Sequence, residues 1–447
     1  KAAMTIRCLS LPIVFAGLAA LPVCGAAQDA VSFRDQIAPI LQDNCVACHC
    51  AKRAEGGYRL DTVEQLVKPG DGAASPIVAG KKDQSEWLVR IQHTDPQLRM
   101  PLDSEPLTKE SVELLGRWIE QGAKLDGIPI TDPLWAITPM KTYPQPPEHY
   151  RSNLPITALA FSSDGSQLFS SGYHEVLAWN PSDGALVARF ANLPQRIYSV
   201  LPSADSNKIF VGGGTPGFLG EVRLLDKATG IVEKEVVRGP DVVLDLALRP
   251  GGQELAIAMA DNTIRILQLD NYLQKRVIAS HADWVTQVAY SEDGKRLGSS
   301  SRDKSAKVTD ADTGELLGSY PGHASAVRGI ACIQEGKQWI SVGADNKVHR
   351  WELENVKKVS EVALGGEPNR LAKDSASVWI PNADKHWYRF DLASNAISTK
   401  QAGHDDWVTA VAVHVATGKL ATGSLDGSIR VWNLADAALI KTWVGKP

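Results

Sequence analysis

The stretch GHDDWVTAVAVHVATGKLATGSLDGSIRVWNLADAALIKTW, residues 403–443, decides the fold of most of this chain. It contains four short hydrophobic segments, and each is followed by the small and polar residues that favour a turn. Four short segments joined by tight connections predict one antiparallel four-stranded sheet. We expect its strands at residues 408–413, 419–424, 429–432 and 438–443.

The same unit recurs along residues 151–447, and the end of its third strand marks each copy. These end positions are spaced by 46, 42, 42, 42, 39 and 42 residues and are Trp179, Leu225, Leu267, Thr309, Trp351, Phe390 and Trp432. The period and the strand content resemble the WD40 repeat, so we expect an all-β propeller of seven blades. Thr309 stands in the place of the blade-ending tryptophan of this repeat, so we expect a weaker side-chain hydrogen-bond network in its blade.

Histidines near the start of several units are predicted to be structural. Gly-His pairs end at His323 and His404, 28 residues before the matching tryptophan, with Asp345 and Asp426 in the turns between. The resemblance implies that His, Asp and Trp join a strand Ser or Thr in one hydrogen-bonded network, because buried polar groups need partners. We expect His281, His323 and His404 to stabilise the fold in this way.

The last unit carries a candidate outermost strand of its own at residues 438–444. We therefore expect each blade to be built from consecutive segments, with no strand borrowed from the start of the chain. The remaining histidines are scattered without ligand spacing. Among them, His174 and its neighbour Glu175 are expected in a solvated turn.

A second informative stretch is Cys45-Val46-Ala47-Cys48-His49. Cys45 and Cys48 can each add across a haem vinyl group, and His49 is then held beneath the iron as an axial ligand. A redox dithiol would need a βαβ context and a zinc site would need a second Cys or His pair, and the sequence offers neither. The motif predicts one covalently bound haem c. Cys50 is a third thiol to which no role is assigned.

The sixth ligand of that iron has two candidates downstream. Met100 precedes a proline in a polar, loop-forming stretch, and thioether ligation there would raise the reduction potential relative to a bis-histidine site. His93 is the other candidate, and an open or water-bound position is the third alternative. We expect Met100 to be the ligand.

Residues 28–127 are expected to form one small all-α haem domain. Phe33, Ile37 and Leu41 fall at helical spacing before the cysteines, and Thr108 can cap a second helix with an apolar stripe. Two such helices can pack on each other and wall the haem.

Several motifs of this domain resemble a known family. Phe33 ahead of the CVACH motif, then GGYRLD at 56–61, RMP at 99–101 and WIEQGA at 118–123 are similar to the planctomycete-type cytochrome c domain. The resemblance implies one haem c, with Met100 as the matching distal ligand. Parts of the propeller resemble the one that accompanies this domain in two-domain proteins.

The N-terminus predicts export. Arg7 precedes an apolar run over 9–23, and small residues offer a cleavage site before Gln28, so residues 1–27 are expected to be a signal peptide. Haem c is attached outside the inner membrane, so we expect a periplasmic or otherwise exported protein with no transmembrane segment in the mature chain. Lipid anchoring at Cys24 is the disfavoured alternative.

Residues 128–150 are predicted to be a stiff, extended linker, because six prolines interrupt them. We expect residues 133–138 to lie at most along a blade edge and to fix the haem domain against the propeller. The net charge of −4 argues against a nucleic acid partner. Residues 28–126 carry 12 Lys and Arg against 16 Asp and Glu, which favours a basic surface on a protein partner.

These features predict a cytochrome that transfers single electrons, with the propeller as a docking platform for a redox partner. One alternative is a haem-containing oxidoreductase with a second site in the propeller. Haem cd1 nitrite reductase also joins a cytochrome c domain to a propeller, but its propeller has eight blades and lacks these repeats. The other alternative is a structural or surface scaffold with an accessory haem. No residue is assigned a catalytic role.

Overall fold

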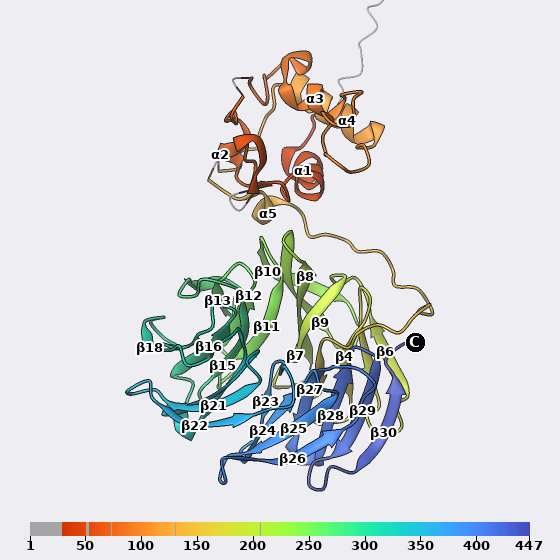
Figure 1. Cartoon of the computed structure of the whole chain (residues 1–447). Coiled ribbons are helices and arrows are strands. Elements are labelled where there is room, and N and C mark those ends of the chain that lie inside the picture. The colour runs from red at the N-terminus through yellow and green to blue at the C-terminus, as the bar shows by residue number, and fades with distance from the viewer. Residues whose placement is uncertain (1–28, 51–52, 73, 130, 206) are drawn as a thin grey trace, which may run out of the picture.

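Seven four-stranded antiparallel sheets form a closed ring, as the repeat period predicts. The structure is a computed structural model and describes residues 29–50, 53–72, 74–129, 131–205 and 207–447. The expected signal peptide, including Arg7 and Cys24, lies outside the described residues. Figure 1 shows the ring in green to blue and a smaller helical module, in orange, beyond one of its edges.

Each blade uses four strands that are consecutive in the chain and neighbours in the sheet. Blades 1 to 3 contain β3 (Leu159–Phe161), β4 (Leu168–Ser171), β5 (Val176–Trp179), β6 (Leu186–Phe190), β7 (Arg196–Pro202), β8 (Lys208–Thr215), β9 (Leu219–Asp226), β10 (Val232–Gly239), β11 (Val243–Leu248), β12 (Glu254–Met259), β13 (Ile264–Gln268) and β14 (Gln274–Ile278). Blades 4 to 7 contain β15 (Val285–Tyr290), β16 (Arg296–Ser301), β17 (Ala306–Asp310), β18 (Leu316–Tyr320), β19 (Val327–Ile333), β20 (Gln338–Gly343), β21 (Lys347–Glu352), β22 (Lys358–Ala363), β23 (Ala372–Lys373), β24 (Ser377–Pro381), β25 (His386–Asp391), β26 (Ala396–Ala402), β27 (Val408–His414), β28 (Lys419–Ser424), β29 (Ser428–Asn433) and β30 (Leu439–Val444).

The burial of each strand follows its position in the blade. Second strands such as β4 and β12 bury every residue, because both of their faces pack against neighbouring blades. Outermost strands such as β26 and β30 are largely exposed, and β26 alternates between exposed and half-buried residues. The continuous hydrophobic runs of the sequence are therefore the inner strands.

The ring closes by contact between the first strand of blade 7 and that of blade 1. The Thr409 hydroxyl donates to the carbonyl of Ile156 (2.6 Å), and the Ile156 N–H donates to the carbonyl of Ser424 (3.0 Å). Blade 7 has its own outermost strand, β30. The prediction that no strand is borrowed from the start of the chain is confirmed.

The N-terminal module is mostly helical but is not purely α. It has a two-stranded antiparallel hairpin, and its helices and strands are the helical turn η1 (Phe33–Ile37), α1 (Ala38–Asn44), β1 (His49–Cys50), β2 (Arg53–Ala54), η2 (Glu55–Gly57), α2 (Val63–Leu66), η3 (Lys82–Gln84), α3 (Glu86–Ile91), α4 (Lys109–Glu120) and α5 (Leu134–Ile137). The expected helix capped by Thr108 is α4, whose cap oxygen accepts from the N–H of Ser111 (3.2 Å). The hairpin was not foreseen because two-residue strands leave no periodic pattern.

One hydrophobic core holds the module together. Phe33, Leu41 and Trp118 are almost fully buried in it, and so are Leu134 and Ile137 of α5. The end of the module therefore lies beyond residue 127, since α5 contributes to its core. None of the helices in the described ranges is long and apolar enough to cross a membrane.

A joint fixes α5 to the outermost strand of blade 2. The Arg238 guanidinium donates to the carbonyls of Trp135 (3.1 Å), Thr138 (2.6 Å) and Pro139 (2.9 Å), and it pairs with Glu235. The Arg265 guanidinium lies 5.2 Å from the centre of the Trp135 ring. Residues 133–138 thus lie along a blade edge, as expected, although residues 134–137 form a helical turn and not an extended strand.

The rest of the linker is strapped to blades 1 and 2 by two buried tyrosines. The Tyr143 hydroxyl donates to Glu221 (2.5 Å), which pairs with Arg223, and both charged side chains have no exposed surface. The Tyr150 hydroxyl donates to Glu175, which pairs with Arg189 (2.7 Å). The chain between the module and the ring is therefore a strap that follows the propeller surface.

The expectation of a solvated turn at His174 and Glu175 was wrong. Glu175 has no exposed surface, and His174 is 7% exposed with its Nδ1 against the carbonyl of Leu193 (2.9 Å). The strap covers this turn, because the Tyr143 ring lies 5.1 Å from the His174 ring. Neither side chain is free to face the channel or a partner.

Candidate haem site

The CVACH motif lies at the point where α1 ends. Cys45 follows the last residue of α1, and its N–H donates to the carbonyl of Leu41 (2.9 Å). The Cys45 carbonyl in turn accepts from the N–H groups of Cys48 (3.2 Å) and His49 (3.1 Å). One helix end therefore fixes a tight turn that carries both thiols and the imidazole.

Both thiols of the motif are free, as is Cys50 beside them. Burial, with the neighbouring Cys48 thiol, raises the pKa of Cys45 to about 12. A redox dithiol needs an accessible thiolate, which this pKa disfavours at neutral pH. Within the described ranges, no cluster of three metal-ligating side chains includes these cysteines. These observations do not favour the dithiol and zinc alternatives.

The hydrogen bonding of His49 leaves one of its ring nitrogens available to a metal. Its Nδ1 lies 3.2 Å from the carbonyl oxygen of Tyr58. A carbonyl can only accept, so Nδ1 carries the proton and the Nε2 lone pair is free. Metal-ligating histidines show this arrangement, in which the second nitrogen donates to a carbonyl that fixes the ring. The residue therefore fits the axial role that the motif predicts.

The side chain of Tyr58 is held by two further bonds. Its hydroxyl donates to the carbonyl of Leu66 (2.7 Å) and accepts from the indole N–H of Trp87 (2.8 Å). Burial raises the pKa of the Tyr58 hydroxyl well above its usual value, so it stays a donor at every physiological pH. Sequence reasoning quoted Tyr58 only as part of a motif and did not find this role.

Aromatic side chains extend from Trp87 across the module. The Trp87 and Trp118 rings lie 6.3 Å apart, and Trp118 stacks on Phe33 at 5.4 Å. The Trp118 indole N–H donates to the carbonyl of Lys124 (2.8 Å). This cluster gives the module a rigid apolar interior, which is the environment that a flat apolar macrocycle requires.

Met100 lies in the loop that follows α3. Its N–H donates to the carbonyl of Arg90 (3.0 Å), the residue before the last of α3, and the residue is half-buried. Leu98 and Leu102 on either side are 44% and 48% exposed. No described interaction joins its side chain to His49, so ligation of iron by Met100 stays a prediction.

His93 is placed differently from His49. Its Nδ1 accepts the backbone N–H of Asp95 (3.1 Å). Since Nδ1 is the acceptor, the proton of the neutral ring lies on Nε2, and no lone pair is free for a metal. The turn at Asp95 thus occupies the lone pair of His93 that a metal would need. This favours Met100 over His93 as the sixth ligand of the iron.

Two buried polar groups of the module have no hydrogen-bond partner among the described residues. Gln42 lies three residues before Cys45, on the same face of α1, and is 4% exposed with both amide atoms unpaired. The Nε of Arg99, next to Met100, is also unpaired. Each such group costs about 1–3 kcal/mol when it stays unpaired in the folded protein. The propeller has similar unpaired atoms, so these two do not by themselves identify a ligand.

The expected histidine networks are present in the propeller. His281 bonds to Asp303 (2.8 Å) and Ser299 (2.8 Å), and its Asp and Ser partners lie on one blade. His404 shares the Thr422 hydroxyl (2.8 Å) with the indole N–H of Trp432 (2.9 Å). These contacts confirm that the two histidines are structural.

The third network contains the one metal-like cluster of the described residues, His323, Asp345 and His349. His323 uses both ring nitrogens, one toward Asp345 (3.0 Å) and one toward Ser341 (2.9 Å). The His349 ring lies flat on it at 4.0 Å and bonds to Tyr320 (3.0 Å). Lone pairs of parallel rings do not converge on one ion, so the cluster is a hydrogen-bonded network. The indole N–H of the matching Trp351, which was expected to join the network, has no partner.

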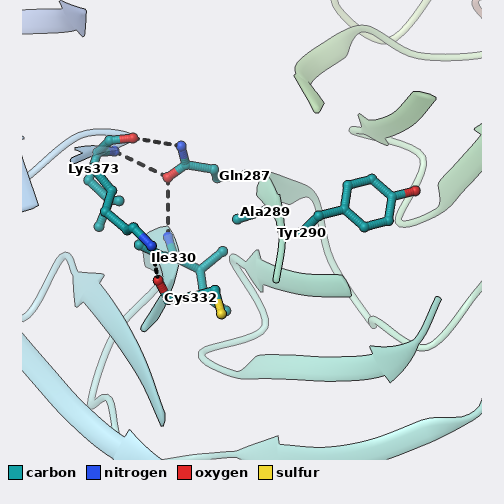
Figure 2. Close-up of a pocket in the computed structure, with 8 residues that line it drawn as sticks. Gln287, Ala289, Tyr290, Ile330, Cys332 and Lys373 are labelled. Carbon is teal, nitrogen blue, oxygen red and sulfur yellow. Dashed lines mark hydrogen bonds between the residues drawn. The ribbon is translucent and has the colours of Figure 1, made fainter. Parts of the chain in front are cut away.

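The centre of the ring is closed by side chains from several blades. Arg370 pairs with Asp245 (3.0 Å) and donates to the carbonyl of Thr157 (3.1 Å). Figure 2 shows the amide oxygen of Gln287, in blade 4, accepting from the N–H of Ile330 in blade 5. The same oxygen accepts from the N–H of Leu371, just before β23 of blade 6 and near Lys373. The two cavities here are about 240 and about 150 Å³, below the roughly 300–1,000 Å³ of cofactor sites. They do not favour a second haem in the propeller.

Comparisons with known proteins agree with this division of the chain. The planctomycete cytochrome C model matches residues 45–103, which include the CVACH motif and Met100. The model of the WD domain with G-beta repeats matches residues 138–181, 273–310, 314–352 and 396–433.

Curated relatives carry WD repeats of distant sequence. Nuclear distribution protein PAC1 of Arthroderma benhamiae is 24% identical over 251 residues, which cover 48% of this chain and 54% of that protein. WD repeat-containing protein 1 of Xenopus tropicalis is 25% identical, covering 56% and 43%. Telomerase protein component 1 of Rattus norvegicus is 29% identical, covering 35% and 6%. The match with the first of these spans about half the length of that relative.

Proposed function

Because this chain joins a planctomycete-type cytochrome c segment to a seven-bladed WD40 propeller, we propose that it is an exported monohaem cytochrome that transfers single electrons. Cys45 and Cys48 hold the haem covalently, and His49 and Met100 are its axial ligands. The observation that carries the proposal is the bond from His49 Nδ1 to the Tyr58 carbonyl, which leaves Nε2 free within a CxxCH motif.

Different residues of the module would make different contacts with the haem. A bound haem would supply one-electron exchange between ferric and ferrous iron. The turn after α1 would hold the group through thioether bonds of Cys45 and Cys48, the Tyr58 carbonyl orients His49, and the aromatic cluster would exclude water. Gln42 and Arg99 offer unpaired polar atoms to the haem carboxylates.

The propeller serves as the docking platform. A WD40 propeller is an interaction scaffold, and the joint at Arg238 holds the haem module beside it. An electron therefore leaves or enters on one side of the ring, near blade 2. Since the module carries more acidic than basic residues, a partner with a basic surface would be attracted to it.

Haem staining tests this proposal directly. The full chain is expressed in a bacterium with the cytochrome c maturation machinery, and the exported protein is denatured and stained for covalent haem. Cys48→Ala should abolish or cripple the staining, whereas Cys50→Ala, a matched change two positions away, should leave it intact. Undiminished staining of Cys48→Ala, or an unstained wild-type protein, would overturn the proposal.

A further inference from the structure

Helix α3 (Glu86–Ile91) touches both sides of the candidate haem site. Its Trp87 donates to the hydroxyl of Tyr58, the residue whose carbonyl receives the proton of His49. Its Arg90 carbonyl accepts the N–H of Met100, one turn further along the helix. A single six-residue helix thus contacts the elements that carry the two candidate axial ligands.

The contacts on the His49 side form an unbroken chain. His49 and Tyr58 lie 3.2 Å apart through Nδ1 and the carbonyl, and their rings meet edge to face at 5.4 Å. The Tyr58 hydroxyl lies 2.8 Å from the Trp87 indole nitrogen and 2.7 Å from the carbonyl of the fully buried Leu66. The N–H of Leu60, two residues after Tyr58, donates to the carbonyl of His49 (2.9 Å). With this backbone bond and the two bonds of the Tyr58 hydroxyl, the segment that carries the Tyr58 carbonyl is held beside His49.

We propose that Tyr58 and Trp87 are positioning residues that set the electronic character of His49, and that α3 ties this setting to the Met100 loop. The inference rests on the proposed function, in which His49 ligates iron. A hydrogen bond from Nδ1–H to a carbonyl makes the imidazole a stronger electron donor, which stabilises ferric over ferrous iron. The Trp87 indole maintains that bond from a distance, through Tyr58.

Three variants of the haem-loaded full chain test the proposal. Trp87→Phe and Tyr58→Phe each remove one partner of the chain and keep an aromatic ring in place. Trp339→Phe is the matched control, because it also loses an indole hydrogen bond to a backbone carbonyl, that of Gly336 (3.0 Å), but lies in β20 of the propeller, outside the haem module.

The first readout is the reduction potential. We expect Trp87→Phe and Tyr58→Phe to raise the reduction potential by the same amount. The expected shift is about 59 mV, which for one electron is a tenfold change in the equilibrium ratio of ferric to ferrous iron. The double variant should shift no further, since both changes break one chain. An unchanged potential in Trp87→Phe, or an equal shift in Trp339→Phe, would overturn the inference.

A second readout needs no haem. In the full-length protein made without the maturation machinery, nitrogen NMR of His49 should show the proton on Nδ1 in the wild type and in Trp339→Phe. In Tyr58→Phe and Trp87→Phe we expect a shift toward the Nε2-protonated form. If the wild-type protein never binds haem, the proposed function fails while this readout still decides the inference. An Nε2-protonated His49 in the wild type would refute the network itself.

Discussion

The joint at Arg238 predicts that the haem module can be released from the propeller by two substitutions. Arg238 is 8% and Glu235 11% exposed in the side chain, so removing the arginine alone would leave an unpaired buried carboxylate in blade 2. The double variant Arg238→Met with Glu235→Gln avoids this cost, because Met fills the volume and Gln is neutral. It removes the hydrogen bonds of Arg238 to the α5 segment, keeps the contact of Arg265 with Trp135 and leaves the blade packed.

The size of the effect follows from the bonds that are lost. Arg238 donates to three backbone carbonyls of the segment around α5, at 3.1, 2.6 and 2.9 Å. A hydrogen bond from a charged donor contributes about 1.5–3 kcal/mol, and the freed carbonyls regain water, so the lower value applies. Three such bonds give about 4.5 kcal/mol for the docking of the module.

Urea unfolding measures this loss with two signals. Haem absorbance reports on the module and tryptophan fluorescence on the propeller, and we expect the haem transition of the double variant to move to lower urea while the propeller transition stays. Small-angle scattering of the folded variant should show a larger radius of gyration. As a control, Arg302→Met removes an exposed guanidinium that lies 4.2 Å from the Trp284 ring and should change neither signal. Coincident transitions and an unchanged radius in the double variant would refute the reasoning.

Three further predictions concern the ligand and the ring. Met100→Ala should lower the reduction potential, remove the sulfur-to-iron charge-transfer band and open the iron to small ligands, while His93→Ala should not; the reverse result would mean bis-histidine ligation. Burial lowers the pKa of His349 and of His404 to about 4, below the unfolded value of 6.5, so the folded state binds fewer protons between these values. Unfolding free energy measured in urea should therefore be constant above pH 6.5 and fall by up to about 3 kcal/mol for each histidine as the pH drops to 4, and a curve that is flat over this window contradicts it. Arg370→Met leaves its buried carboxylate partner unpaired and should cost about 3–5 kcal/mol in urea unfolding; a loss below about 1 kcal/mol would show that the centre of the ring is not held there.

The ring could be predicted from the sequence because its information is local and repeated. Each unit carries four strand segments and a turn pattern, so the period predicted seven blades. Trp432 indicated where the third strand of the last blade ends. The last unit had a fourth segment, from which β30 could be expected. The hairpin of β1 and β2 could not be foreseen, since two residues are too few to show a period.

The parts that could not be predicted depend on contacts between distant segments. Glu175 lies in a polar turn, and it is buried beneath Tyr150 of the strap and its partner Arg189. The partners of Tyr58 likewise come from Leu66 and from Trp87, which is 29 residues away. Local composition carries no signal for such burial, whereas the spacing of the CVACH motif was enough to predict a ligand role for His49.

The contacts of the strap also limit how the N-terminal module can be moved from this propeller to another. The sockets for Tyr143 and Tyr150 are made by residues of blades 1 and 2, Glu221 with Arg223 and Glu175 with Arg189. Transplanting the N-terminal module onto a different propeller would therefore give a loosely held chimera unless these four residues travelled with it, together with Arg238 and Glu235 of the joint. Conversely, the same six side chains would be the minimal graft for an engineer who wished to mount another module on a WD40 ring in one orientation.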